Sequence, residues 1–137
     1  MIMPHSAPPT RHVFVYGTLR RGGRNDIARF DPPPRFVAEA SIRGTLYDLG
    51  SYPGAVLGGD GMLAGEVYAI APALEARLDL LEEVQPDGSG EYIKRDVRVR
   101  VGEVEIDCLV YEIHPACIAG RCVIASGNWF DRAPPFS

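Results

Sequence analysis

The sequence has few cysteines, a single lysine, no excess of positive charge and no long apolar run. Three cysteines among 137 residues are an odd and small number, which is unsuited to a disulfide framework and ordinary in a reducing compartment. Because 14 Lys and Arg stand against 18 Asp and Glu, the net charge is −4 and no basic surface for nucleic acid is expected. The longest apolar stretches, such as residues 13–16, are far shorter than the roughly 20 residues that cross a bilayer. We therefore expect neither a nucleic-acid-binding nor a membrane-spanning protein.

Lys94 is the only lysine and hence the only candidate for Schiff-base chemistry. The GxxxxG spacing of a phosphate-binding P-loop does not precede it. The first residues, MIMPHSAPPTRH, carry proline and histidine where a signal peptide has its apolar region. We therefore predict a cytoplasmic protein without a phosphate-binding P-loop.

Length and composition predict one compact domain. Hydrophobic residues make up 46% of the chain and charged residues 23%, which is typical of a folded protein. We expect a disordered leader over residues 1–11, a single domain over 12–130 and a C-terminal tail over 131–137, where two prolines stand together.

Five segments have the alternation or the β-branched and aromatic content of strands: 12–16, 36–49, 63–70, 92–101 and 104–113. The last two are expected to pair as a hairpin. A bulge is expected at Gly44, and the glycine-rich segment 50–61 is expected to be a turn region.

Helical signals are fewer. Pro72 fits the first position of a helix, and leucines 74, 78 and 81 recur at helical spacing after it. A short helix is expected over residues 26–30, and the tail from His114 to Ser137 is expected to be irregular. The result is an α+β fold with one principal helix, whose sheet has so few helices to cover it that it is expected to curl toward a barrel.

The turn after the first strand is one candidate site. Gly17 allows a sharp change of direction, and the N–H groups of Gly17, Thr18 and Leu19 could converge on a carboxylate or carbonyl oxygen. The alternative is an ordinary turn that ends a strand.

The acidic pair at the end of the principal helix is a second candidate. The helical spacing of the leucines places Glu82 at the border of the core and Glu83 toward water. A carboxylate at a helix C-terminus faces an unfavourable dipole, which raises the pKa as a general base requires. The alternative is a pair of solvated glutamates.

A metal site is not expected. The spacing of His114, Cys117 and Cys122, with Cys108 nearby, matches no standard zinc pattern, and buried free thiols are the simpler interpretation. No arrangement near these residues would activate a cysteine nucleophile.

Several short motifs occur in a characteristic order. They are YGTL at 16–19, YDLG at 47–50, YPG at 52–54, GEVY at 65–68 and LDLLE at 78–82, followed by Tyr92 and by SGNW at 126–129. Together they resemble the gamma-glutamylcyclotransferase-like superfamily over about residues 12–130. The length is most similar to the small branch of gamma-glutamylamine cyclotransferases.

The resemblance implies a mixed β-barrel with one principal helix and short flanking helices. It implies that the turn formed by Tyr16, Gly17, Thr18 and Leu19 presents backbone donors to a γ-glutamyl group, and that Tyr92 lines the pocket. The glutamate of the LDxxE motif, which acts as general acid and base in the family, falls on Glu82. The helical spacing independently places this residue near the core.

The implied reaction needs neither a metal nor a cofactor, because the α-amine and the γ-carbonyl that react belong to the same small molecule. Ring closure of the γ-glutamyl amide would release 5-oxoproline and a free amine or amino acid. Two alternatives stay open on the sequence alone: a binding module that keeps the pocket without turnover, and an interaction protein that uses the barrel only as a scaffold.

Overall fold

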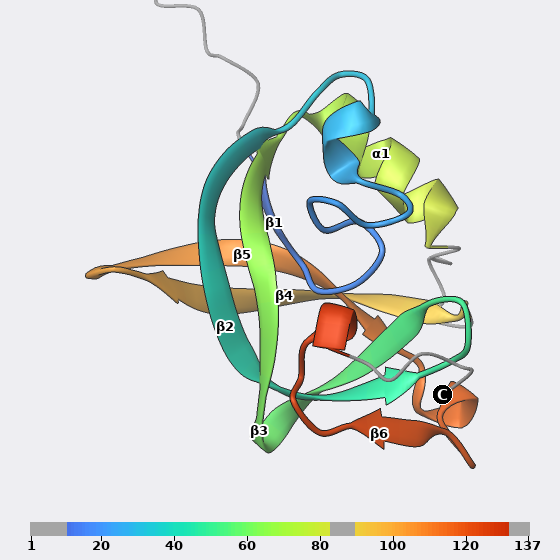
Figure 1. The fold of residues 1–137 in the computed structure, drawn as a ribbon. Coiled ribbons are helices and arrows are strands. Elements are labelled where there is room, and N and C mark those ends of the chain that lie inside the picture. Colours follow the sequence, from blue (N-terminus) through green and yellow to red (C-terminus); the bar gives the residue numbers. More distant parts are fainter. Residues whose placement is uncertain (1–10, 83–89, 132–137) are drawn as a thin grey trace, which may run out of the picture.

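The computed structural model describes residues 11–82 and 90–131. Six strands form one mixed sheet in the order β4-β5-β1-β3-β2-β6, which curls into a half-barrel (Figure 1). The strands are β1 (Arg11–Val15), β2 (Arg35–Asp48), β3 (Pro53–Ile70), β4 (Tyr92–Val101), β5 (Val104–Ile113) and β6 (Cys122–Ile124). The helix α1 (Pro72–Leu81) and three short 3-10 helices, η1 (Ile27–Arg29), η2 (Pro115–Cys117) and η3 (Trp129–Asp131), accompany them. The predicted α+β class with one principal helix is confirmed.

Strand β1 lies in the middle of the sheet and is buried on both faces. It pairs antiparallel with β3 and parallel with β5. Val13 and Val15 pack into the cluster that contains the buried leucines of α1, whereas Phe14 and Tyr16 pack into the cluster enclosed by the curled sheet. Because alternate side chains of a strand point to opposite faces, this short strand joins the two halves of the core. The turn that follows it therefore has a rigid base.

The expected turn region over 50–61 is wrong in part: β3 extends from Pro53 to Ile70, but residues 58–61 have no register partner in β2, and Gly58 and Gly59 have positive φ. The first residues of β3 pair with the end of β2, and the register shifts between Arg43 and Gly44, which confirms the expected bulge. Gly54 lies where β3 passes close to β5, since a Cβ on it would meet the Ile113 Cβ at 2.6 Å. Here glycine permits close packing of strands rather than a turn.

The predicted helix and hairpin are both confirmed. Helix α1 has Pro72 at its start and Glu82 as its C-cap residue. Strands β4 and β5 pair from Tyr92↔Ile113 to Val101↔Val104, with the bounds expected from the sequence. One detail of the helix is wrong: the side chains of Leu74 and Leu78 are buried, but Leu81 is 43% exposed and lies at the edge of the core.

The chain after residue 114 is not irregular throughout, because β6 pairs with the end of β2 at the edge of the sheet. Arg11, assigned to the leader, is the first residue of β1, and Asp131 ends η3. The other residues of the expected leader and tail, together with Glu83, lie outside the described residues. In the part of the chain that the structure describes, no helix has the length and apolar character needed to cross a membrane.

Candidate active site

A pocket of about 250 Å³ lies where the end of β1 meets the C-terminus of α1. Residues 14–19 form one wall, and Leu81 and Glu82 form the wall contributed by the helix. Glu91 and Tyr92, at the beginning of β4, close a third side. The pocket thus brings together segments that are distant in the sequence.

The turn after β1 is held by its carbonyl groups, and its N–H groups bind none of the residues that the structure describes. Gly17 O accepts a hydrogen bond from Arg20 N at 3.0 Å, Thr18 O from Asn25 N at 2.9 Å, and Leu19 O from Ile27 N at 2.9 Å. The Asn25 side chain also donates to Thr18 Oγ1 at 3.1 Å. Among the residues described, the N–H groups of Gly17, Thr18 and Leu19 have no partner within the protein. Backbone donors in this state can bind an anion or a polarised carbonyl.

Pro53 fixes the outer side of this turn. A Cβ on Gly17 would lie 2.6 Å from Pro53 Cγ, so the turn and the beginning of β3 can approach this closely only with glycine at position 17. The hydroxyl of Tyr92 donates to Pro53 O at 2.6 Å and holds the proline in place. Tyr92 therefore contacts the pocket with its ring and supports the turn with its hydroxyl.

Tyr16 also uses its hydroxyl within the protein. It donates to Tyr111 O at 2.6 Å and accepts from Ala55 N at 3.1 Å. Burial and the negative charge of Glu82 raise the pKa of Tyr16 far above its usual range. This tyrosine is a neutral wall of the pocket that ties three strands together, and not an acid or base near neutral pH.

The Glu82 carboxylate is the principal titratable group of the pocket. Its side chain is partly exposed, and no hydrogen-bond or ion-pair partner occupies it among the described residues. Burial raises its pKa to about 7, and the negative charge of Glu91 contributes to the rise. A carboxyl group with this pKa can both accept and release a proton at neutral pH.

Glu91 is held differently, because the Tyr52 hydroxyl donates to Glu91 Oε1 at 2.6 Å. This hydrogen bond is the largest cause that raises the pKa of Tyr52 to about 12, with burial second. Of these two carboxylates in the pocket, Glu82 is therefore the one that accepts no hydrogen bond from the residues that the structure describes.

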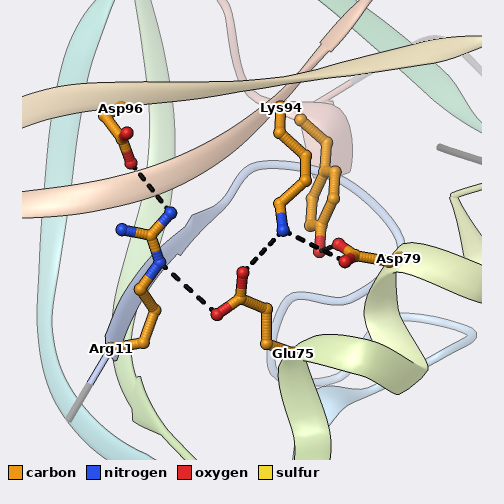
Figure 2. Close-up of polar contacts among 6 residues, drawn as sticks. Arg11, Glu75, Asp79, Lys94 and Asp96 are labelled. Carbon is orange, nitrogen blue, oxygen red and sulfur yellow. Dashed lines mark hydrogen bonds and ion pairs between the residues drawn. The ribbon is translucent and has the colours of Figure 1, made fainter. Parts of the chain in front are cut away.

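A charged network connects α1 to β1 and β4 (Figure 2). Lys94 Nζ donates to Glu75 Oε2 at 2.6 Å and to Asp79 Oδ2 at 3.0 Å, which joins β4 to two successive turns of α1. The other oxygen of Asp79 accepts from the Tyr111 hydroxyl at 2.7 Å. Arg11 extends the network from Glu75 to Asp96. Glu82 follows Asp79 by three residues and donates its N–H to Leu78 O at 2.9 Å, so it lies within one helical turn of this network.

The sequence-predicted site residues all line this one pocket: Tyr16, Gly17, Thr18, Leu19, Glu82 and Tyr92. Sequence reasoning missed Glu91, Tyr111, Arg24 and Asn25, which line it as well. Tyr111 could have been found from the alternation of β5, which places it on the same face as Leu109 and Ile113. Glu91 and Arg24 belong to no periodic pattern, so no signal in the sequence marks them.

His114, Cys117, Cys122 and Cys108, which the sequence offered as metal ligands, do not form a metal site in the part of the chain that the structure describes. Within residues 11–82 and 90–131, no group of three His, Cys, Asp or Glu side chains could hold a metal ion. Cys108 is buried in the core, where burial raises the pKa of its thiol to about 11. The thiol therefore stays protonated at neutral pH.

Comparisons with known proteins agree with this geometry. The family model described as gamma-glutamyl cyclotransferase, AIG2-like, matches residues 13–131. A gamma-glutamylcyclotransferase family protein of Citrobacter rodentium is 36% identical over 121 residues, which cover 88% of this chain and 96% of the relative. A gamma-L-glutamyl-butirosin B gamma-glutamyl cyclotransferase of Niallia circulans is 34% identical over 93 residues, or 67% of this chain and 58% of the relative.

A solved structure supports the same assignment. The crystal structure of an AIG2-like protein from Mus musculus superposes with a TM-score of 0.66 at 26% identity, over 80% of this chain and 82% of the other. The curled sheet and the principal helix are shared with that fold. The chain therefore belongs to the AIG2-like gamma-glutamyl cyclotransferase family and is an enzyme of this type.

Proposed function

We propose that the protein cyclises a γ-glutamyl amide to 5-oxoproline and releases a free amine or amino acid, with Glu82 as the general acid and base. The N–H groups of Gly17, Thr18 and Leu19 hold the γ-glutamyl group, while Tyr16 and Tyr92 form the walls. The reaction takes place in the cytoplasm, since three free cysteines suit a reducing compartment. No metal or cofactor takes part.

The reaction needs two proton transfers and one exchange of C–N bonds. The Glu82 carboxylate takes a proton from the substrate α-ammonium, and the neutral amine attacks the γ-carbonyl carbon to form the ring C–N bond. The developing oxyanion is stabilised by the backbone donors. The α-nitrogen gives up two protons and keeps one as the lactam N–H. The leaving nitrogen gains both through Glu82, its bond to the γ-carbon breaks, and it departs as an ammonium.

One observation carries the proposal: a carboxylate with a pKa of about 7 lies in the same pocket as three backbone N–H groups, and none of the four has a partner within residues 11–82 and 90–131. A γ-glutamyl amide presents complementary groups, because its ammonium requires a base and its carboxylate and carbonyl require donors. Folding of one molecule in a pocket replaces the collision of two reactants, so no protein nucleophile is needed.

The test is to incubate the purified protein with a panel of γ-glutamyl amino acids and γ-glutamylamines and to measure 5-oxoproline. Glu82→Gln keeps the size of the side chain and is expected to remove release. Glu105→Gln is the matched control, because Glu105 lies on β5 in an exposed ion pair with Arg98. An active Glu82→Gln variant would overturn the role of Glu82. Saturable binding of the panel without product would instead indicate a binding module.

A further inference from the structure

A buried carboxylate outside the pocket, Glu66, binds the residues that follow the turn, and the proposed reaction does not use it. Glu66 on β3 is only 4% exposed, and it stands opposite Val15, the last residue of β1. It does not line the pocket. Any effect of Glu66 on the bound substrate must therefore pass through the residues that it contacts.

Both oxygens of Glu66 are used by the residues that follow the turn. Glu66 Oε2 accepts from Arg20 Nε at 2.6 Å, and Glu66 Oε1 accepts from the backbone N–H of Arg21 at 2.8 Å. The Tyr68 hydroxyl also donates to Glu66 Oε1, at 3.3 Å. The Glu66 carboxylate thus binds the side chain of Arg20 and the main chain of Arg21, the two residues that follow the turn.

The guanidinium of Arg20 is fixed on its remaining sides. It donates from Nη1 to Asn128 Oδ1 at 2.7 Å and lies 4.5 Å from the centre of the Phe130 ring. Arg20 is 8% exposed, so its charge is removed from water together with that of Glu66. Removal of two charges from water is costly, and the pair persists only because its geometry satisfies both groups.

We propose that Glu66, acting with Arg20, is a positioning residue that holds the turn so that the N–H groups of Gly17, Thr18 and Leu19 point into the pocket. Arg20 N donates to Gly17 O, and this carbonyl shares a planar peptide unit with the Thr18 N–H, so displacement of Arg20 displaces that donor. The inference rests on the proposed function only in naming the ligand of these donors.

An exposed ion pair on the hairpin of β4 and β5 differs from the buried pair of Glu66 and Arg20. The side chains of Arg98 and Asp107 are 67% and 73% exposed and join two neighbouring strands that already share a full ladder of backbone pairs. Glu66 and Arg20 instead join β3 to a segment without regular secondary structure. The buried Glu66–Arg20 pair therefore constrains the conformation of the segment after β1, whereas the exposed Arg98–Asp107 pair contributes little to the stability of its hairpin.

The first test compares Glu66→Gln with the control Asp107→Asn. The amide of Gln can still accept from the Arg21 N–H but loses its charge toward Arg20. We expect KM for the best γ-glutamyl substrate to rise by at least about tenfold, with the acid limb of the pH profile unchanged, because Glu82 is untouched. Asp107→Asn should change neither quantity. A Glu66→Gln variant with unchanged KM and a lower melting temperature would overturn the proposal and leave a structural role only.

The second test does not depend on turnover. Amide hydrogen exchange of Asn25 and Ile27, whose N–H groups bind carbonyls of the turn, is expected to accelerate in Glu66→Gln while exchange within the β4–β5 hairpin stays the same. Asn128→Ala, which removes one partner of Arg20, should give a smaller change of the same kind. Unchanged exchange at Asn25 and Ile27 would contradict the proposal. Absence of 5-oxoproline release by the unmodified protein would contradict only the proposed function.

Discussion

The negative charge of Glu91 raises the pKa of Glu82 within a pocket that both carboxylates line. Burial is the larger cause, and together they bring the pKa of Glu82 to about 7. Glu91 itself accepts a hydrogen bond from the Tyr52 hydroxyl, which fixes the position of its carboxylate. In the proposed reaction, Glu91 would therefore contribute to the pH at which Glu82 accepts a proton without itself taking it.

The first prediction concerns the pH dependence of the reaction. If Glu82 is the base, kcat/KM should fall about tenfold for each pH unit below 7, because only the carboxylate form can take the substrate proton. Glu91→Gln removes the repelling charge and should move this acid limb to lower pH. The measurement is a pH–rate profile of both proteins, with Asp107→Asn as the control for a surface charge. An acid limb that stays in place in Glu91→Gln would show that another group titrates.

The second prediction concerns stability. The pKa of Glu82 rises from 4.5 to about 7 on folding, so the native state binds more protons than the unfolded state between these values. The free energy of unfolding therefore decreases as the pH rises through this window. Glu82→Gln removes the cost and should be more stable than the unmodified protein by about 1–3 kcal/mol at pH 8, with no gain below pH 4.5. Urea denaturation at the two pH values measures the difference, and an equal gain at both would contradict the assigned pKa.

The third prediction concerns the only lysine. Burial alone would lower the pKa of Lys94, but its hydrogen bonds to Glu75 and Asp79 outweigh this effect and raise it. Lys94→Met should leave the two carboxylates facing each other across one turn of α1 and destabilise the protein by about 1–2 kcal/mol. It should also lower kcat/KM, because the end of the helix carries Glu82. Arg98→Gln, in an exposed pair, is the control for urea denaturation and should change little. Equal losses in both variants would show that the Lys94 network does not position the helix.

Local patterns predicted the elements whose residues repeat at a regular spacing. The hairpin of β4 and β5 has the expected bounds, and α1 begins at Pro72, because alternation and leucine spacing each report directly on burial. The segment 50–61 was misread in part, since Gly54 and Gly61 lie where β3 passes close to other strands, and such contacts depend on residues distant in the sequence. Strand β6 has three residues and gains its order from pairing with β2, which no local pattern records.

The candidate site likewise contains residues that the sequence predicted and residues that it did not. The motifs that resemble the family placed Glu82, Tyr92 and the turn over residues 16–19, and all of them line one pocket. The partners that give these residues their properties were not predictable. Glu91 acts on Glu82 through space, and Glu66 reaches the turn from a strand that lies beside β1 only after folding. Long-range charge and burial, and not residue type, determine these effects.

The last prediction tests whether the turn is the binding site. Gly17→Ala places a Cβ 2.6 Å from Pro53 Cγ, and Pro53 is held by the Tyr92 hydroxyl, so the turn must move away. Gly120→Ala is a control for backbone cost alone, because Gly120 has a φ of +75° and no atom within 4 Å of an added Cβ. Both variants should lose about 1 kcal/mol of stability or somewhat more. Only Gly17→Ala should also weaken the binding of 5-oxoproline, measured by calorimetry, by at least about tenfold, because a shift of even a few tenths of an ångström separates three donors from one ligand. If both variants bind 5-oxoproline as the unmodified protein does, the N–H groups of the turn do not form the site, and the ligand must lie nearer to Glu91 and Tyr52.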